Sequence, residues 1–213
     1  MTETITPVND LIKAVEEADS ASKLFLAVSN LAKVRSPLAI PTLIEVLGYN
    51  NPGAAVAATE GLIALGETAI TSLLENVDDY NYGARAWAIR VFAGIGDPRA
   101  LQLLLKAASS DFSLSVRRAA TKGLGTIKWQ QIPSDTLSQT QQQILDTLLI
   151  TAQDGEWVVR YATVVSLANL YPAVHNLDLK NIIEKTLISL RDSDPEIAIT
   201  TRSKLALQNL AKG

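Results

Sequence analysis

The sequence predicts an all-α protein, a solenoid of about six two-helix repeats that form a curved superhelix. Three observations predict this fold class: a period of about thirty residues, helical spacing of apolar residues within each period, and helix-start and helix-stop residues between the helices. Hydrophobic residues make up 47% of the 213-residue chain. Most of them are Ala, Leu, Ile and Val, and Ala and Leu in particular favour closely packed helices. We find no convincing strand alternation that competes with this pattern.

The first helix of the repeat is visible in three segments, 36–47, 66–77 and 97–108. Each places apolar residues at i, i+3 or i+4, and i+7, which is the spacing of one helix face. The residues that correspond between the three segments are Ala39, Ala69 and Ala100, and Leu43, Leu73 and Leu104. These segments therefore predict helices that bury the same side in every repeat.

The second helix alternates with the first and is visible in four segments, 53–66, 83–96, 114–127 and 157–170. Its shared register contains Leu62, Phe92, Leu124 and Leu167, and it extends to Leu31 and Leu205 near the two ends. A helix pair of this kind cannot bury its apolar face alone, so neighbouring pairs must stack. This arrangement resembles the HEAT-repeat class, whose stacked repeats form a groove that usually binds a partner.

Punctuation residues support the repeat boundaries. Five potential helix-capping residues stand directly before a proline, namely Thr6, Ser36, Asn51, Asp97 and Asp194. Glycines near expected helix C-termini, where a left-handed conformation costs little, are Gly48, Gly66, Gly96 and Gly125. We expect residues 1–213 to form a single HEAT-like repeat domain, with a longer polar inter-helix insertion, a loop containing Pro133, at about 128–141.

Composition excludes several classes of function. The formal net charge of −3 gives no basic footprint for nucleic acid. The chain has no Cys and a single His, His175, which argues against disulfides, thiol catalysis, a Ser-His-Asp triad and a metal site. The N-terminal residues carry early acids and no apolar h-region, so we expect no signal peptide, and no uninterrupted apolar run is long enough to span a membrane. We therefore expect a cytoplasmic protein.

An Asp-x5-Arg spacing occurs three times, as Asp79–Arg85, Asp111–Arg117 and Asp154–Arg160. In the structural interpretation, which we favour, each Asp caps a helix and pairs with an Arg of the adjacent repeat, since a carboxylate matches the guanidinium fork. In the functional interpretation, the Arg side chains bind an acidic ligand in a groove.

Aromatic residues depart from the repeat in two places. Segment 78–90 contains Tyr80, Tyr82, Trp87 and Arg90, and segment 154–161 contains Glu156, Trp157 and Tyr161. Such residues fill gaps between stacked helices in many proteins. Several of them beside Arg and carboxylates at the same end of neighbouring repeats also fit a lined groove. Both interpretations stay open from the residues alone, and we expect His175 to be a loop residue.

The segments "YNYGARAWAIRVFAGIGDPRAL" and "DGEWVVRYATVVSL" resemble the phycobilin lyases of the E/F type, and the resemblance covers essentially the whole chain. Length and the position of the second segment look most like the F-type (beta) subunit of a heterodimeric phycocyanobilin lyase. The resemblance implies an enzyme subunit that is active only with an E-type partner. The pair would attach phycocyanobilin through a thioether to a cysteine of the phycocyanin alpha subunit apoprotein during phycobilisome assembly.

The resemblance also implies roles for the residues singled out above. Phycocyanobilin is then a substrate, and no cofactor is bound permanently. Arg can pair with the bilin propionates, a carboxylate can accept from pyrrole nitrogens, and aromatic faces can stack on the rings. The candidate bilin-binding or groove residues are Tyr80, Tyr82, Arg85, Trp87, Arg90, Trp157, Arg160 and Tyr161. The candidates for a catalytic proton transfer are Asp154, Glu156 and Tyr161.

The chain departs from part of this family at its only histidine. Relatives that also isomerise the bilin carry a His-Cys motif, whereas His175 is followed by Asn176, so attachment without isomerisation is expected. The alternative function is a non-catalytic HEAT-repeat adaptor or chaperone that binds phycobiliproteins during assembly or degradation. Clustered Tyr, Trp and Arg would serve either purpose.

Overall fold

The computed structural model describes residues 7–76 and 81–212. These residues form twelve α-helices and five short 3-10 helices, and no strand occurs within them. The chain divides into two compact units, Met1–Ile95 and Gly96–Gly213, which we call unit 1 and unit 2. The predicted all-α repeat fold is confirmed, whereas the single domain and the curvature of the whole array stay predictions.

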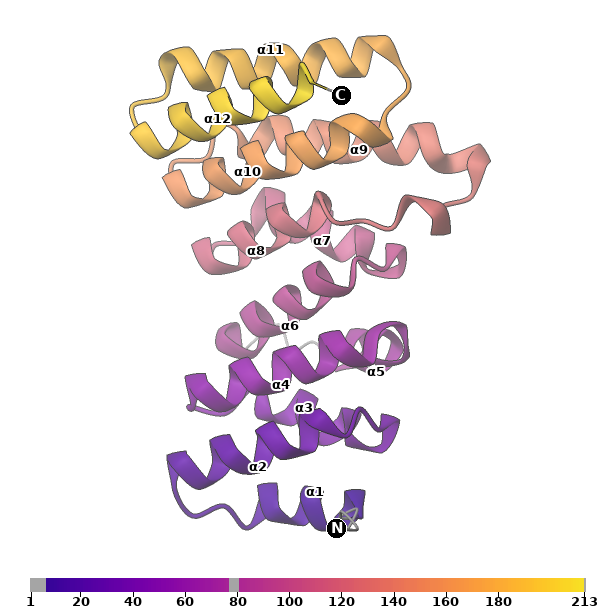
Figure 1. Cartoon of the computed structure of the whole chain (residues 1–213), viewed down its shortest axis with the longest axis vertical. Coiled ribbons are helices and arrows are strands. Elements are labelled where there is room, and N and C mark those ends of the chain that lie inside the picture. The colour runs from indigo at the N-terminus through magenta and orange to yellow at the C-terminus, as the bar shows by residue number, and fades with distance from the viewer. Residues whose placement is uncertain (1–6, 77–80, 213) are drawn as a thin grey trace. The chain divides into compact units, whose positions relative to one another are not determined.

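Unit 1 consists of three helix pairs. Its elements are α1 (Val8–Glu16), α2 (Ala21–Lys33), η1 (Pro37–Ala39), α3 (Ile40–Val46), α4 (Pro52–Leu65), η2 (Gly66–Ala69), α5 (Ile70–Glu75) and α6 (Tyr82–Ile95). Helices α2, α4 and α6 pack in succession as one layer, and α3 contacts α5 in the other layer (Figure 1). Each first helix is short and is introduced by a 3-10 turn, except in the first pair.

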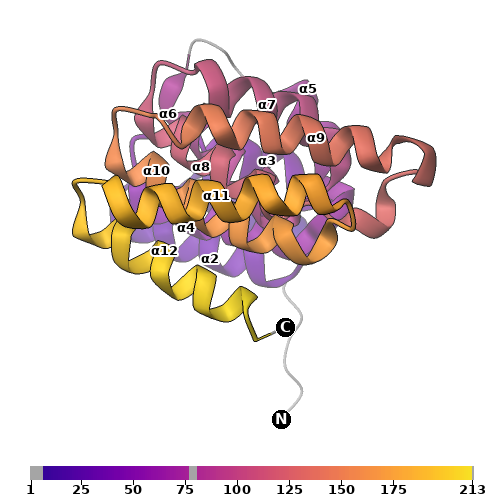
Figure 2. The same cartoon turned by 90° about the horizontal axis from the view of Figure 1, so that it is seen from above.

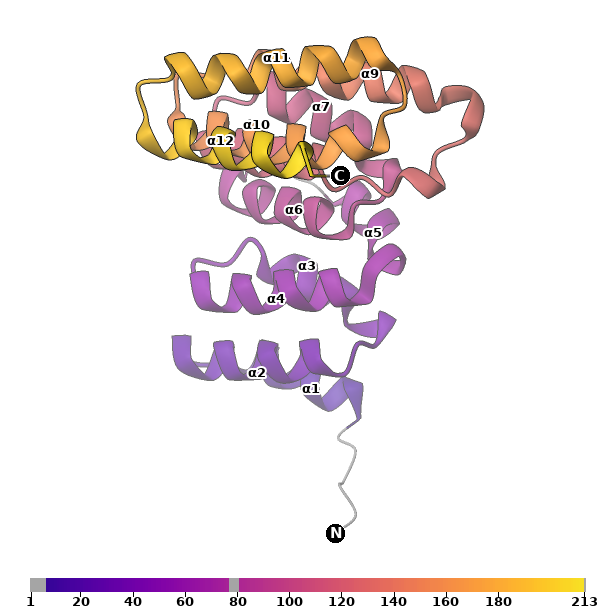
Figure 3. The same ribbon diagram turned by 45° about the horizontal axis from the view of Figure 1, so that its top comes forward.

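Unit 2 also consists of three helix pairs. Its elements are η3 (Pro98–Ala100), α7 (Leu101–Ser110), α8 (Leu114–Leu124), η4 (Trp129–Gln131), α9 (Ser134–Thr151), α10 (Trp157–Leu170), η5 (Tyr171–Ala173), α11 (Leu177–Ser193) and α12 (Ile197–Leu210). Helix α10 packs between α8 and α12, and α9 lies between α7 and α11 (Figure 2). The view in Figure 3 shows α10 and α12 as one layer against α9 and α11.

The apolar register predicted for the repeat forms the cores of the two units. The register residues Leu31, Leu62, Phe92, Leu124 and Leu167 are all 0% exposed. The corresponding Ala and Leu residues of the first helices are buried as well. The repeat was therefore aligned correctly from the spacing of apolar residues alone.

The register extension to Leu205 is wrong. Leu205 is 48% exposed, and α12 buries Ile199, Ser203 and Ala206 instead. Successive residues of an α-helix are about 100° apart, so burying Ala206 turns Leu205 toward solvent. A small residue and a polar residue at core positions concealed the true register of this helix.

Three of the predicted capping residues are helix N-caps. The side chains of Ser36, Asn51 and Asp97 each accept a hydrogen bond from a backbone N–H in the first turn. Thr6 lies outside the described residues. Asp194 is not the cap of α12, which begins at Ile197; its carboxylate accepts the backbone N–H of Glu196 at 2.9 Å instead.

The polar insertion predicted at about 128–141 is mostly helical. The 3-10 helix η4 occupies Trp129–Gln131, and α9 begins at Ser134, so residues 134–141 form the first two turns of an 18-residue helix. Gln141 is buried, and its Nε2 donates to the backbone oxygen of Ala173 at 2.8 Å. Because Gln141 is a polar residue at a buried position, the apolar spacing of a helix is interrupted here, and this part of α9 was not predicted.

One segment, Pro52–Glu75, is long and apolar enough to cross a membrane by length and composition, with a mean hydropathy of 1.2. The segment is not an uninterrupted apolar run, because it contains Glu60 and Glu67. In the structure the segment contains two helices, because α4 ends at Leu65 and Gly66 adopts a left-handed φ of +66°. Half of the apolar window is buried inside the protein, as in the core helices of many proteins.

Gly125 permits close packing of α8 against α10. Its φ is −85°, so the left-handed conformation expected for it does not occur. A Cβ at this position would lie 2.6 Å from the Cα of Ser166, whose Oγ donates to the backbone oxygen of Thr121 at 2.7 Å. The backbones of the neighbouring helices α8 and α10 therefore approach each other so closely at Gly125 that a larger side chain would not fit.

We expect Gly125→Ala to lower the free energy of unfolding by about 2 kcal/mol, because overpacked cores must shift their backbone. The matched control is Gly155→Ala, since a Cβ at Gly155 meets nothing within 4 Å. Urea denaturation followed by circular dichroism measures both variants. Equal stability of the two variants would contradict the close approach of α8 and α10.

Candidate functional site

Two bidentate ion pairs join successive repeats of unit 2. Arg117 of α8 donates from Nε and Nη2 to the two carboxylate oxygens of Asp154, at 2.7 and 3.1 Å. Arg160 of α10 donates in the same way to Asp194, again at 2.7 and 3.1 Å. The pairing of an Asp with the Arg of the adjacent repeat, predicted from the Asp-x5-Arg spacing, is confirmed for these two arginines.

The remaining donor of each arginine holds the turn before its own helix. Arg117 Nη1 donates to the backbone oxygens of Asp111 (3.0 Å) and Phe112 (3.1 Å). Arg160 Nη1 donates to those of Asp154 (2.8 Å) and Gly155 (3.2 Å). Each guanidinium thus connects its own turn to the Asp of the next repeat. We call these two ion pairs the Asp–Arg ladder.

Each ladder Asp also organises the start of the following helix. Asp154 Oδ1 accepts the backbone N–H of Glu156 at 2.8 Å, two residues before α10 begins at Trp157. Burial raises the pKa of Asp154, but the Arg117 hydrogen bonds, the Glu156 N–H and nearby positive charge outweigh this effect and hold the pKa below its usual value. The same balance, with Arg160 and Glu196, holds the pKa of Asp194 below its usual value. Both groups are carboxylates, not acids, at neutral pH.

The lowered pKa values make the stability of unit 2 depend on pH. A carboxyl group whose pKa is lower in the folded state stabilises the protein above its unfolded pKa, about 4 for Asp, and this contribution is lost as the pH falls through the folded-state value. We therefore expect the free energy of unfolding to drop below about pH 4. Asp194→Asn should lose less stability than the parent over the same interval. Urea denaturation at pH 7 and at about pH 3 measures this difference, and identical losses would contradict it.

An exposed apolar row lies beside the ladder. It consists of Leu114, Trp157 and Ile197, the first residues of α8, α10 and α12, which are 43%, 44% and 80% exposed. These helix starts lie on the same side of unit 2 (Figure 1). Trp157 is among the residues predicted for the site from the sequence, whereas Leu114 and Ile197 are not. The sequence does contain a pattern that relates the three residues. Leu114, Trp157 and Ile197 each stand three positions after an aspartate, namely Asp111, Asp154 and Asp194.

The start of α10 brings three of the predicted site residues together. Trp157 and Tyr161 are four residues apart on one helix, so they share a face, and Tyr161 is half-buried. Glu156 precedes them as the N-cap residue, is exposed and makes no side-chain cap hydrogen bond. Asp154 and Arg160 lie next to this group but are engaged in the ladder.

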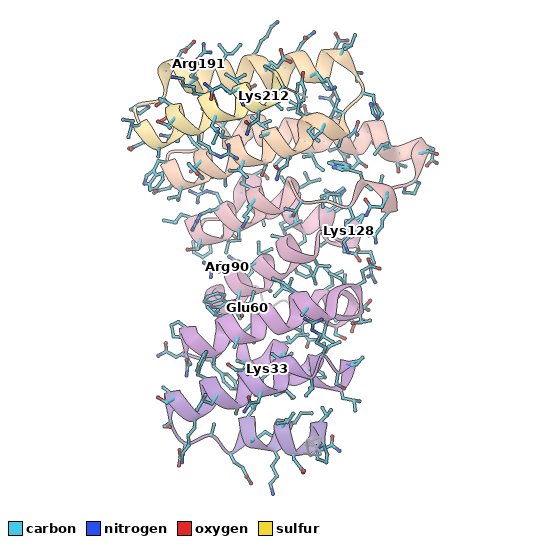
Figure 4. All side chains as sticks on the ribbon, in the orientation of Figure 1. Lys33, Glu60, Arg90, Lys128, Arg191 and Lys212 are labelled. Carbon is cyan, nitrogen blue, oxygen red and sulfur yellow. The ribbon has the colours of Figure 1, made fainter. Side chains whose placement is uncertain are left out.

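The second group of predicted site residues lies on α6 of unit 1. The guanidinium carbon of Arg90 lies 4.2 Å from the centroid of the Trp87 ring, a cation–π contact. Figure 4 shows Arg90 on α6. Arg85 is buried, at 8% exposed. Tyr82 is the first residue of this helix, while Tyr80 and Asp79 lie outside the described residues.

The stacked helix pairs and the Asp–Arg ladder define a HEAT-repeat protein. A family model of HEAT repeats matches residues 70–168. A designed armadillo repeat protein in complex with a (KR)4 peptide, 16% identical with a TM-score of 0.59 over 95% of this chain and 99% of its own, shares the fold alone.

Relatives that align over almost the whole chain show which family of HEAT-repeat proteins this is. A phycocyanin alpha phycocyanobilin lyase CpcF of Synechocystis is 52% identical over 97% of this chain and 96% of its own, and a phycobilisome maturation protein of Synechococcus elongatus is 55% identical over 96% and 98%. A chain in the structure of the complex of CpcE and CpcF of phycocyanin lyase from Nostoc is 47% identical, with a TM-score of 0.76 over 81% of this chain and 99% of its own. The chain belongs to the family of CpcF-type phycocyanobilin lyase beta subunits.

Proposed function

We propose that this chain is the beta subunit of a heterodimeric phycocyanobilin lyase. With an E-type partner, it attaches phycocyanobilin through a thioether to a cysteine of the phycocyanin alpha subunit. The observation that carries this function is the 52% identity, over almost the full length of both chains, to a phycocyanin alpha phycocyanobilin lyase. The similarity to a chain of a CpcE–CpcF complex supports the heterodimer.

The reaction assigns a limited task to this chain. The acceptor thiol adds across the ethylidene double bond of the bilin: a carbon–sulfur bond forms, a proton is transferred to the adjacent ring carbon, and no group leaves. The chain contains no Cys, so the sulfur comes from the acceptor and no covalent bilin thioether forms on this subunit. Its contribution is to hold the bilin in an orientation that favours attack by the thiol.

The start of α10 is the part of unit 2 that suits this task. Trp157 offers an exposed aromatic face for a pyrrole ring, and Tyr161 extends that face by one helical turn. Glu156 and Tyr161 are better placed to handle a proton than Asp154, because the carboxylate of Asp154 already accepts three hydrogen bonds. The bonds between Arg160 and Asp194 favour a structural role for Arg160 over bilin binding.

The α6 group is a second candidate surface for bilin contact, and it belongs to unit 1. Tyr80, Tyr82, Arg85, Trp87 and Arg90 stay candidates for bilin contact, and the Trp87–Arg90 pair supports this assignment because it presents an aromatic ring together with a cation. Phycocyanobilin is the substrate, and no permanently bound cofactor is required. We place the protein in the cytoplasm and propose attachment without isomerisation, since the chain has no Cys for a His-Cys motif.

Reconstitution tests the proposed function. This chain, an E-type subunit, phycocyanin alpha apoprotein and phycocyanobilin are mixed, and covalent pigment is scored by zinc staining of a denaturing gel and by absorbance. We expect rapid attachment only when both subunits are present. Controls with each subunit alone measure the slow unassisted addition of free bilin to thiols. Attachment no faster than in these controls, with apoprotein binding intact, would instead identify an adaptor.

A further inference from the structure

A cavity of about 470 Å³ lies in unit 2, at the C-terminal ends of α10 and α12. Helix α10 contributes Asn169, the turn after it contributes Tyr171, α11 contributes Lys180, and α12 contributes Arg202 and Asn209. Apolar side chains such as Leu210 complete the lining. Small-molecule sites combine apolar walls with a few convergent polar groups, and this lining contains both kinds of side chain.

Arg202 differs from the ladder arginines of the same unit. The three guanidinium nitrogens of Arg117 and of Arg160 all donate to protein oxygens. Within residues 96–212, Arg202 and Arg118 have no carboxylate within ion-pair distance. Of these two, Arg202 lines the cavity, while Arg118 is exposed on α8. The cavity therefore contains a guanidinium fork that has no carboxylate of residues 96–212 within ion-pair distance.

Lys180 adds a second positive charge, and Tyr171 provides a fixed aromatic face. Lys180 Nζ lies 4.7 Å from the centroid of the Tyr171 ring. The Tyr171 hydroxyl donates to Glu184 Oε1. This hydrogen bond and the contact of Lys180 with the ring face together fix the orientation of the Tyr171 side chain. Glu184 is not a lining residue of the cavity, and one of its two carboxylate oxygens, Oε1, accepts from the Tyr171 hydroxyl. The two cations of the lining thus face the cavity without an acidic side chain among the lining residues.

We propose that this cavity binds a carboxylate arm of a flat conjugated organic acid, and that its occupant is a propionate of the bilin substrate. This assignment rests on the proposed function. The cavity lies at the opposite end of α10 from Trp157, about 20 Å away along the 14-residue helix, so it is an alternative to the start of α10 as the bilin contact of unit 2. Arg202 forms the two parallel hydrogen bonds that suit a carboxylate, and Lys180 adds a point charge. Tyr171 and Leu210 pack against the pyrrole ring that carries the propionate. The side-chain amides of Asn169 and Asn209 form hydrogen bonds with the polar groups at the edge of that ring.

The test is a titration of the full chain, combined with its E-type partner, with phycocyanobilin and separately with phycocyanobilin dimethyl ester. The ester keeps the conjugated rings but lacks the carboxylates. We expect Arg202→Gln to weaken binding of the diacid roughly tenfold, because a charged hydrogen-bond partner is lost. Binding of the ester should be weak for the parent and unchanged in the variant. Bilin absorbance provides the binding curve.

Two further variants sharpen the test. Lys204→Gln removes an exposed cation two residues from Arg202 that does not line the cavity, so it should bind the diacid like the parent. Lys180→Gln should weaken diacid binding in the same direction as Arg202→Gln, and it carries the test if circular dichroism shows that Arg202→Gln is unfolded. Equal diacid binding by folded Arg202→Gln and the parent, or equal binding of diacid and ester by the parent, would overturn the assignment.

The failure of this inference differs from failure of the proposed function. If the parent heterodimer transfers bilin to the apoprotein but the Arg202 and Lys180 variants bind the diacid normally, the propionate site is wrong and the lyase function stands. If the parent heterodimer transfers no bilin, the proposed function itself is wrong.

Discussion

Arg117→Ala should lower the free energy of unfolding by about 2–3 kcal/mol, because it leaves a partly buried carboxylate without its partner. The side chains of Arg117 and Asp154 are only 18% and 11% exposed, so solvent cannot replace the lost bonds fully. The same change frees the backbone oxygens of the turn before α8. Urea denaturation followed by circular dichroism at pH 7 measures the loss.

The adjacent residue provides the control. Arg118 is an exposed arginine on the same helix, so Arg118→Ala should change stability by less than about 0.5 kcal/mol. Adding Asp154→Ala to Arg117→Ala should cost less than the sum of the two single changes, since the partners act as one pair. Additive losses, or an Arg117→Ala variant as stable as the parent, would show that the ladder does not hold the repeats together.

Trp157→Ala should lower the rate of bilin transfer about tenfold or more, which corresponds to roughly 1.4 kcal/mol of transition-state stabilisation. Its effect on the free energy of unfolding should stay below about 1 kcal/mol, because Trp157 is 44% exposed at the first position of α10. The Trp157→Ala variant should therefore lose transfer activity while it keeps most of its stability. Tyr161→Ala should show the same separation with a larger stability loss, since Tyr161 is half-buried.

The matched control for Trp157 is Leu205→Ala. Leu205 is comparably exposed at 48%, but it lies in α12, eight residues after Ile197, and is not part of the apolar row. We expect the Leu205 variant to transfer bilin at the parental rate. A Trp157→Ala protein that is unfolded by circular dichroism would identify Trp157 as a packing residue. A folded variant with the parental transfer rate would remove it from the groove.

The repeat and its ladder could be predicted from the sequence because both follow a constant spacing. Once Leu124 and Leu167 are aligned, the Asp before α10 falls opposite the Arg of α8, although the partners are 37 residues apart. The apolar row follows a constant spacing as well, because each of its residues stands three positions after Asp111, Asp154 or Asp194. The register fails where the core residues are polar or small, as at Gln141 in α9 and at Ser203 and Ala206 in α12.

The cavity at the end of unit 2 could not be predicted by such reasoning. Its walls come from α10, the following turn, α11 and α12, and no common spacing relates Tyr171, Lys180 and Arg202. Arg202 stands eight residues after Asp194, whereas each ladder arginine stands six residues after its Asp, so spacing alone separates Arg202 from the ladder. Spacing does not show which carboxylates of unit 2 lie near Arg202, because that depends on how three helices pack.

The measurement that tests the account most directly is a count of turnovers. The heterodimer of this chain and its E-type partner is supplied at one-tenth of the concentration of phycocyanin alpha apoprotein, with excess phycocyanobilin, and covalent bilin is counted by absorbance after denaturation. A lyase predicts several attached bilins per heterodimer, at a rate well above that of either subunit alone. A yield that stops at one bilin per heterodimer, or that never exceeds the unassisted reaction, would contradict catalysis and leave a carrier or an adaptor.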